Sequence, residues 1–378
     1  MDFLFTPEQK MIQTVVKQFA NEVCKPRAEE IDKTGEFPMD SFKEMAKCGL
    51  TGLGYPKEYG GAGEDKLAEV IAVEEIAKVC ATQAAMLSIH GVTPWLITKF
   101  GNEEQKQIYL PRLLNGGVLA AFALTEPNAG SDASRVQTVA VEDGEDYILN
   151  GTKCFITGGG VAGIYTIIAQ TDKAKGIKGL TAFIVESDTK GFSTGKIEEK
   201  MGIKGSQTAE LIFEDVRVPK KNILGQVGKG FKYAMMCLDS ARIGTGAQGL
   251  GIAEGALELA LQYAKERVQF GKPISQLQGI QWYLAEMKVK VESARWMVYQ
   301  AASLEDRGVK FTEEAALAKL YASQTAREVT NLALQIHGGY GYMKDYPLER
   351  MYRDAKITEI YEGTSEIMKV VIASNMLK

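Results

Sequence analysis

The sequence predicts an α+β fold in three parts. These are an N-terminal α-helical domain over residues 1–115, a central antiparallel β-barrel or sandwich over 116–226, and a C-terminal four-helix bundle over 227–378. Apolar residues recur at helical spacing in both outer parts, whereas the middle contains short β-rich runs separated by Gly, Asn and Asp turns. Because no helical segment interrupts these runs, a doubly wound sheet is disfavoured.

The first helix is expected to start at a capped end. Thr6 precedes Pro7, which suits the first helical position, and apolar residues from Met11 to Phe19 follow at helical spacing. Further helical patterns run over about 67–79 and 93–114. The N-terminal part is therefore expected to be all helical.

The middle part is expected to fold as short strands. Glu142–Gly144 and Asn150–Gly151 are typical turn sequences between such strands. The β-rich runs are 119–125, 137–141, 147–149, 153–157, 165–170, 180–186 and 210–213.

Long helical patterns return after residue 230. They cover 231–266, 275–307, 312–336 and 347–360, and the connections between them are short. Segments of this length with such connections favour a four-helix bundle.

Composition excludes several classes of protein. The chain has 378 residues, 24% charged and 45% hydrophobic, with a formal net charge of -4, so no basic surface for nucleic acid or an anionic membrane is expected. The five cysteines are scattered and the only histidines are His90 and His337, which argues against a disulfide framework and a metal site. No apolar run approaches the ~18 residues of a membrane span. Since the first residues carry acid where a signal peptide carries base, we expect a cytoplasmic protein.

Two glycine motifs match catalytic signatures, but their context favours turns. Residues Gly158–Gly163 fit G-x-G-x-x-G, yet the following 164–170 is β-rich where a dinucleotide site needs a helix, so a hairpin turn is expected. Residues Gly191–Gly195 fit G-x-S-x-G, but 196–207 lacks an apolar helical face, so again a turn is expected.

Three other stretches combine backbone donors, hydroxyls and charge in loops after predicted strands or helices. They are Leu124–Asp132 (LTEPNAGSD), Arg267–Gly271 (RVQFG) and Tyr361–Thr364 (YEGT). Each is similar to a signature of the acyl-CoA dehydrogenase family, and their order and spacing match that family along the whole chain. Within the family, the sequence most resembles bacterial short-chain, butyryl-CoA-type members.

The resemblance implies FAD-dependent α,β-dehydrogenation of a short-chain acyl-CoA, butyryl-CoA to crotonyl-CoA. Glu362 is the expected base for the α-proton, while the β-hydride goes to flavin N5 and the electrons are exchanged with electron-transferring flavoprotein. Burial against flavin and substrate should raise the pKa of Glu362 toward neutrality. Other branches of the family carry their base at the position of Ala241, and alanine cannot abstract a proton.

The resemblance also assigns cofactor and oxyanion contacts. The backbone N–H of Glu362 and a ribityl hydroxyl of FAD should hold the thioester oxygen. The adenosine half should be bound by a neighbouring subunit, which implies a homotetramer or at least a dimer. The FAD-binding residues are expected to be Phe122, Leu124, Thr125, Ser131, Phe155, Thr157, Arg267, Phe270, Gln278, Gln335, Gly338, Gly339, Thr364 and Glu366.

Substrate contacts are predicted from the same resemblance. The acyl pocket should be shaped by the segment Gln83–Trp95, including Met86, Leu87, Ile89 and His90, and Gln83 offers no charge for a dicarboxylate. Alternatively, Ser131 caps a turn, and Asp239 and Arg242 simply form a pair three residues apart on a helix. The residues expected to hold CoA or line the site are Ser131, Asp239, Arg242, Tyr361 and Gly363.

Three rival functions remain open at this point. An acyl-CoA oxidase on the same scaffold would deliver electrons to oxygen and release peroxide. A hydrolase built on Ser193 would cleave thioesters without flavin. A non-catalytic flavin-bearing module would leave the flavin absorbance unchanged by butyryl-CoA.

Overall fold

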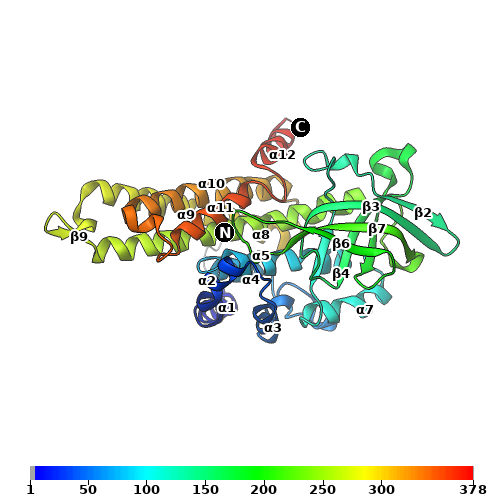
Figure 1. Ribbon diagram of the computed structural model, residues 1–378, viewed down its shortest axis with the longest axis horizontal. Helices are drawn as coiled ribbons and strands as arrows, with labels where there is room; N and C mark the ends of the chain where they lie inside the picture. Colours follow the sequence, from blue (N-terminus) through cyan, green and yellow to red (C-terminus); the bar gives the residue numbers. More distant parts are fainter. Residues whose placement is uncertain (1–4, 378) are drawn as a thin grey trace.

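The computed structural model describes residues 5–377 and is elongated (Figure 1). Helices α8 (Gly230–Glu266), α9 (Gln278–Asp306) and α10 (Thr312–His337) extend to one end. A β-sheet occupies the other end, and the N-terminal helices lie along the middle. The observed architecture is therefore the predicted α+β arrangement.

The N-terminal region is helical up to Leu114. Thr6 caps the first helix as predicted: its side chain accepts from the backbone of Gln9, whose side chain accepts in return from the Thr6 N–H. The single pattern predicted over 93–114 is two helices, because Asn102 forms a second capping box and starts a new helix. The helices are α1 (Pro7–Phe19), α2 (Lys25–Thr34), α3 (Met39–Lys47), α4 (Lys66–Ala77), α5 (Ala81–His90), α6 (Val92–Phe100) and α7 (Glu103–Leu114).

The sheet has eight strands and is mostly antiparallel. Their order is β6-β7-β3-β2-β4-β5-β8, and β1 runs parallel beside β4. The strands are β1 (Ala120–Ala123), β2 (Val139–Asp143), β3 (Asp146–Thr157), β4 (Ile164–Gln170), β5 (Leu180–Glu186), β6 (Phe192–Ile197), β7 (Thr208–Pro219) and β8 (Ile223–Leu224).

Three predicted turns differ in the structure. Asn150–Gly151 lies inside β3, where the pairing with β7 is irregular and the strand continues. The glycines of 158–163 do form a turn, but not a hairpin, since β2 lies between β3 and β4 in the sheet. Residues 192–197 form the edge strand β6, so Ser193 is on a strand with no helix after it and no nucleophile elbow.

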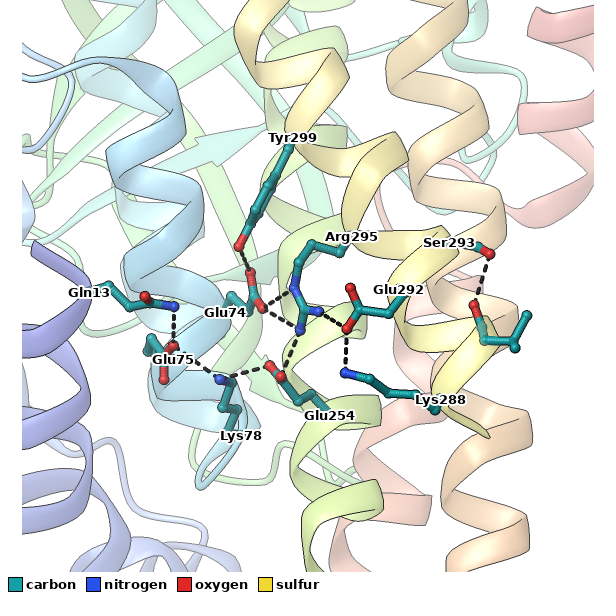
Figure 2. Close-up of polar contacts among 11 residues, drawn as sticks. Gln13, Glu74, Glu75, Lys78, Glu254, Lys288, Glu292, Ser293, Arg295 and Tyr299 are labelled. Atoms are coloured by element: carbon teal, nitrogen blue, oxygen red, sulfur yellow. Dashed lines mark hydrogen bonds and ion pairs between the residues drawn. The ribbon is translucent and has the colours of Figure 1, made fainter. Parts of the chain in front are cut away.

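Helix α4 is the buried centre of the helical part, and a cluster of charges joins it to α8 and α9 (Figure 2). Arg295 of α9 contacts the Glu74 carboxylate of α4 at 3.2 Å and the Glu254 carboxylate of α8 at 2.7 Å. Tyr299 donates to the other oxygen of Glu74 at 2.6 Å. Buried charges need such partners, so the cluster fixes the register of the three helices.

The chain ends in α11 (Leu348–Ala355) and α12 (Ser365–Met376). α12 packs on α10 and stands away from the other helices in Figure 1. Short strands β9 (Val268–Gln269) and β10 (Lys272–Pro273) form a hairpin at the far tip of the bundle. Among residues 5–377, none of the helices has the length and apolar character needed to cross a bilayer.

Candidate active site

The loop before α12 turns sharply at Glu362. Glu362 has φ 53° and Gly363 has φ 102°, so two successive residues lie at positive φ. Thr364 then caps α12 by accepting from the N–H of Ile367 at 3.3 Å. The turn aims the Glu362 side chain back toward α8.

The Glu362 carboxylate is half-buried against the middle of α8. Thr245 donates to its Oε2 at 3.0 Å. Burial raises the pKa of Glu362, and this outweighs the opposing effects of the Thr245 hydrogen bond and the positive charges of Lys319, Arg242 and Lys66. The site therefore holds a carboxylate that takes up a proton more readily than one in water.

Two buried cations hold the backbone of this turn. Lys319 of α10 donates to the carbonyl oxygen of Gly363 at 2.6 Å, and Arg242 of α8 donates to that of Glu362 at 3.3 Å. Burial lowers the pKa of Lys319 to about 8. Because both carbonyls are bound from helices α8 and α10, the turn cannot rotate without breaking these contacts.

The remaining residues predicted near the base lie around it. Arg242 pairs with Asp239 at 2.7 Å, and Thr312 donates to Asp239 at 2.8 Å. Tyr361 donates to Gln248 of α8, whose amide donates in turn to the carbonyl oxygen of Ala81.

A second group of predicted residues gathers where β1 and β3 meet. The Cys154 N–H donates to the carbonyl oxygen of Thr125 at 3.0 Å, which brings β3 beside the loop that follows β1. Phe155 projects from this strand with φ 56° and 64% of its side chain exposed. Thr157 ends β3, and Ser131 lies in an exposed loop. Phe122 is partly buried and Leu124 buried under the same loop.

A buried ion pair fixes the loop after β1. Lys153 of β3 donates to Glu126 at 2.8 Å and to the carbonyl oxygen of Leu124 at 3.0 Å. Glu126 also accepts from the backbone N–H groups of Gln137 and Thr138. The segment that carries Thr125 is thus held from both sides.

A third group lies at the tip of the bundle, around a cavity of about 520 Å³. Arg267, Phe270, Gly338 and Gly339 line it, and the Arg267 guanidinium lies 5.4 Å from the centre of the Tyr340 ring. No carboxylate of residues 5–377 pairs with Arg267. Phe270 has φ 54° and is 89% exposed, so it stands out from the tip.

Other predicted residues lie outside these contacts. Gln278 and Gln335 are exposed at the ends of α9 and α10 that face the tip, and Glu366 is exposed on α12. The buried His90 is held by the carbonyl oxygen of Leu113 and the N–H of Ala120, so it has a structural position. Gln83 is also buried and donates to the carbonyl oxygen of Cys24.

The tip is far from Glu362 in the same chain. Twenty-one residues of α8 separate Thr245 from Glu266, which at 1.5 Å per residue is about 32 Å. The structure thus gathers the predicted residues into separate groups rather than one site.

Sequence reasoning missed Thr245, Gln248 and Lys319. Each lies within a helix, at a position where threonine, glutamine or lysine is unremarkable. They belong to the site only because they bond residues of the final loop that lie 117, 113 and 44 positions further along the chain.

Comparison with known proteins identifies the family of this chain. Family profiles described as the N-terminal, middle and C-terminal domains of acyl-CoA dehydrogenase match residues 6–117, 121–216 and 228–377. The chain belongs to the acyl-CoA dehydrogenase family. It is an enzyme of the acyl-CoA dehydrogenase type, and the cofactor of the family is FAD.

Three relatives are similar over the whole chain. The acryloyl-CoA reductase (NADH) of Anaerotignum propionicum is 62% identical, covering 100% of this chain and 96% of that one. The structure of butyryl-CoA dehydrogenase from Megasphaera elsdenii is 48% identical with a TM-score of 0.98, covering 100% of both chains. A chain from a study of the electron transferring flavoprotein of Acidaminococcus fermentans is 50% identical, with a TM-score of 0.98 and 100% coverage of both.

The residues present fit FAD. Arg267 offers a guanidinium with no carboxylate partner among the described residues, in a concave cavity, which suits a pyrophosphate. Phe155 is exposed on the strand that ends at Thr157, and the preceding residue of that strand bonds the backbone of Thr125, so an aromatic ring and two threonines share one region, which suits a flat polar ring system.

Proposed function

We propose that the enzyme dehydrogenates a short-chain acyl-CoA at Cα and Cβ, butyryl-CoA to crotonyl-CoA, with Glu362 as the base. The observation that carries this proposal is the Glu362 carboxylate, which is half-buried, bound by Thr245 and held in a left-handed turn. A thioester acidifies the α-C–H bond, and a carboxylate of raised pKa is matched to remove that proton.

The chain's own groups position the reacting bond. Glu362 takes the α-proton, and when the reaction runs in reverse the protonated carboxyl returns it to Cα. Bound FAD supplies the acceptor for the hydrogen and two electrons that leave Cβ. The net change is loss of one proton and one hydride from adjacent carbons, which leaves a double bond.

The backbone N–H of Glu362 is available to the thioester oxygen. It donates to no acceptor within residues 5–377, and the neighbouring carbonyls are held by Arg242 and Lys319. A preorganised donor of this kind is typically worth about 3–4 kcal/mol of barrier. This arrangement supports polarisation of the thioester as the α-proton leaves.

We further propose that FAD is bound between subunits. Thr245, which binds the Glu362 carboxylate, and Glu266, which precedes Arg267, are about 32 Å apart along α8. This exceeds the separation of flavin and pyrophosphate within one FAD, so the Arg267 group serves a neighbouring chain. A homo-oligomer, a tetramer or at least a dimer, is therefore required for complete sites.

Electron-transferring flavoprotein is the proposed electron partner. Support comes from the similar chain in the study of the Acidaminococcus fermentans flavoprotein. The bacterial relatives also support the expected cytoplasmic location. Substantial peroxide during turnover, with no transfer to the flavoprotein, would favour the oxidase alternative.

Replacing the base tests the mechanism. Glu362→Gln keeps the size of the side chain and removes its proton affinity, so FAD and acyl-CoA should still bind. Reduction of the flavin by butyryl-CoA should slow by about 10²–10⁴-fold. Anaerobic stopped-flow bleaching of the flavin absorbance measures this rate.

Glu359→Gln is the matched control. Glu359 lies three residues away and pairs with the outer cations Arg327 and Lys356, so its loss should leave reduction unchanged. Near-normal bleaching in Glu362→Gln would show that another group is the base.

A further inference from the structure

Thr245 is the only side chain of residues 5–377 that hydrogen-bonds the Glu362 carboxylate. Its hydroxyl donates to Oε2 at 3.0 Å, and no group in this part of the chain donates to Oε1. The nearby cations Lys319 and Arg242 donate to backbone carbonyl oxygens instead. The ionised form of this half-buried carboxylate therefore depends on a single hydroxyl for its direct hydrogen bonding.

The hydroxyl of Thr245 is directed away from its own helix. Threonine within a helix commonly donates to the carbonyl oxygen four residues earlier, as Thr330 of α10 does to Ala326 at 2.7 Å. A hydroxyl has one proton to donate, and Thr245 gives it to a residue 117 positions further along the chain. The Thr245 side chain is only 2% exposed, so water has little access to replace this bond.

Close packing fixes α8 at the turn that carries Thr245. A side chain at Gly244 would collide with the hydroxyl of Ser88 on α5, and a Cβ at Gly246 would lie 3.1 Å from the Val298 side chain of α9. Because both neighbours approach the backbone of α8 so closely, the helix cannot turn or slide here without a clash. The Thr245 hydroxyl is therefore a donor held at a fixed place.

We propose that Thr245 is a positioning residue for the base: its hydroxyl holds Oε2 of Glu362, keeps the carboxylate ionised and leaves Oε1 to take the α-proton. The inference rests on the proposed function, in which Glu362 is the base. A hydroxyl bonds a carboxylate more strongly than a neutral carboxyl group, so it stabilises the form that accepts the proton. A fixed carboxylate also approaches the Cα–H bond in one orientation, which favours proton transfer.

Other groups act on Glu362 from three helices and the final loop. They are Lys319 of α10, Arg242 and Cys237 of α8, Lys66 of α4 and Tyr361 of the loop. Burial raises the pKa of the tyrosine and of the cysteine, so both are neutral near pH 7, whereas the three cations favour the carboxylate. Replacing Thr245 leaves all five groups in the chain, so a change in the pH profile is assigned to the hydroxyl.

Thr245→Val keeps the shape of the side chain and removes the hydroxyl. FAD and acyl-CoA should still bind, and the maximum rate of flavin reduction by butyryl-CoA should fall by about 10-fold, because the carboxylate is no longer held in one orientation. Loss of the bond raises the pKa of Glu362 further, so the rising limb of this rate should move to higher pH. The reverse reaction needs the protonated carboxyl, so its falling limb should also move to higher pH. Stopped-flow absorbance of the flavin measures both directions.

Two further variants give the comparison. Thr245→Ser keeps the hydroxyl and should return both limbs to their wild-type positions. Thr330→Val removes the same atoms from a buried helical threonine whose hydroxyl bonds its own helix, so it should leave the profile unchanged. Thr245→Ala removes the hydroxyl as well and takes the place of the valine variant if that protein does not fold. Limbs and rates that stay as in the wild type without the hydroxyl would overturn the inference.

Proton uptake on binding separates this inference from the proposed function. Calorimetry of crotonyl-CoA binding to the oxidised enzyme, in buffers of different ionisation enthalpy, counts the protons that the protein takes up. Uptake that disappears in Glu362→Gln belongs to Glu362, and its maximum should lie at higher pH in Thr245→Val. A maximum that does not move would refute the role of Thr245 alone. Flavin reduction at a normal rate in Glu362→Gln would instead refute the proposed base.

Discussion

Glu362 has a strained backbone conformation and is also the proposed base. A non-glycine residue at φ 53° costs about 1–3 kcal/mol and persists only where its surroundings hold it. Here Lys319 and Arg242 bind the two carbonyls of the turn, and Thr364 starts a helix directly after it. These contacts maintain the strained backbone conformation, which directs the carboxylate to Thr245.

Lys319 should lower the pKa of Glu362 as well as hold the turn that carries it. Glu362 acts only as the carboxylate, so the rate of flavin reduction rises as the pH passes through its pKa. Lys319→Met removes a positive charge that lowers this pKa, so the rising limb of the pH profile should move to higher pH. The pH dependence of stopped-flow flavin reduction measures the shift.

Lys319→Arg is the informative companion variant, because it keeps the charge and a donor for the Gly363 carbonyl oxygen. It should restore the rising limb of the pH profile to its wild-type position even if it lowers the maximum rate. A limb that stays in place in Lys319→Met, or moves to lower pH, would contradict the electrostatic role.

At the scale of elements, helix α4 is positioned by charges as well as by apolar packing. Glu74 is almost fully buried, and its partners Arg295 and Tyr299 both come from α9 (Figure 2). The same helix carries the buried pair Lys66–Glu69, and Lys66 is one of the charges that act on Glu362, so the register of α4 against α8 and α9 affects the surroundings of that carboxylate.

Removing Arg295 should therefore destabilise the helical part strongly. Arg295→Met leaves Glu74 and Glu254 without their shared cation, and breaking a buried pair in this way costs about 3–5 kcal/mol. The loss should appear as a lower urea midpoint for the FAD-loaded enzyme at neutral pH.

Lys288→Met provides the comparison for Arg295→Met. Lys288 pairs with Glu292 on the outer face of the same helix, and such exposed pairs are worth about 1 kcal/mol or less. A similar midpoint for both variants would show that the Glu74 cluster contributes no more than a surface pair.

For the whole molecule, the distance between Glu362 and the tip of the bundle governs assembly. A single chain holds both halves of the proposed FAD site, but one lies at the middle of α8 and the other at its C-terminal end. Each complete site would then combine Glu362 of one copy with Arg267 of another. A single copy would then bind FAD poorly, and complete binding would require the oligomer.

Complementation between two inactive variants tests this assembly. Arg267→Ala should purify with little FAD, and Glu362→Gln should bind FAD without reacting. In mixed oligomers made by co-expression, roughly a quarter of the sites would combine the two native residues if subunits mix at random. Butyryl-CoA-dependent flavin reduction should therefore reappear in the mixture.

Separately purified variants, combined without exchange of subunits, are the control and should remain inactive. Absence of recovery in verified mixed oligomers would show that each site takes Glu362 and Arg267 from the same copy, or that the two residues serve unrelated sites. A fully flavinated monomer would contradict the shared site directly.

Sequence patterns alone were sufficient to predict many of the helices and the family of this protein. Helical periodicity predicted α8, α9 and α10 nearly to the residue, and the cap at Thr6 was predictable because capping depends on neighbouring residues. The three motifs pointed to the family, which the comparisons confirm. These features are local, so the order of residues determines them.

Tertiary structure decided what no local pattern contains. Asn150–Gly151 has a turn sequence, yet pairing with β7 keeps it within a strand. Thr245 and Lys319 reach Glu362 and Gly363 only because α8 and α10 pack beside the final loop. Long-range packing sets such distances, and it is therefore packing that makes an ordinary glutamate the proposed base.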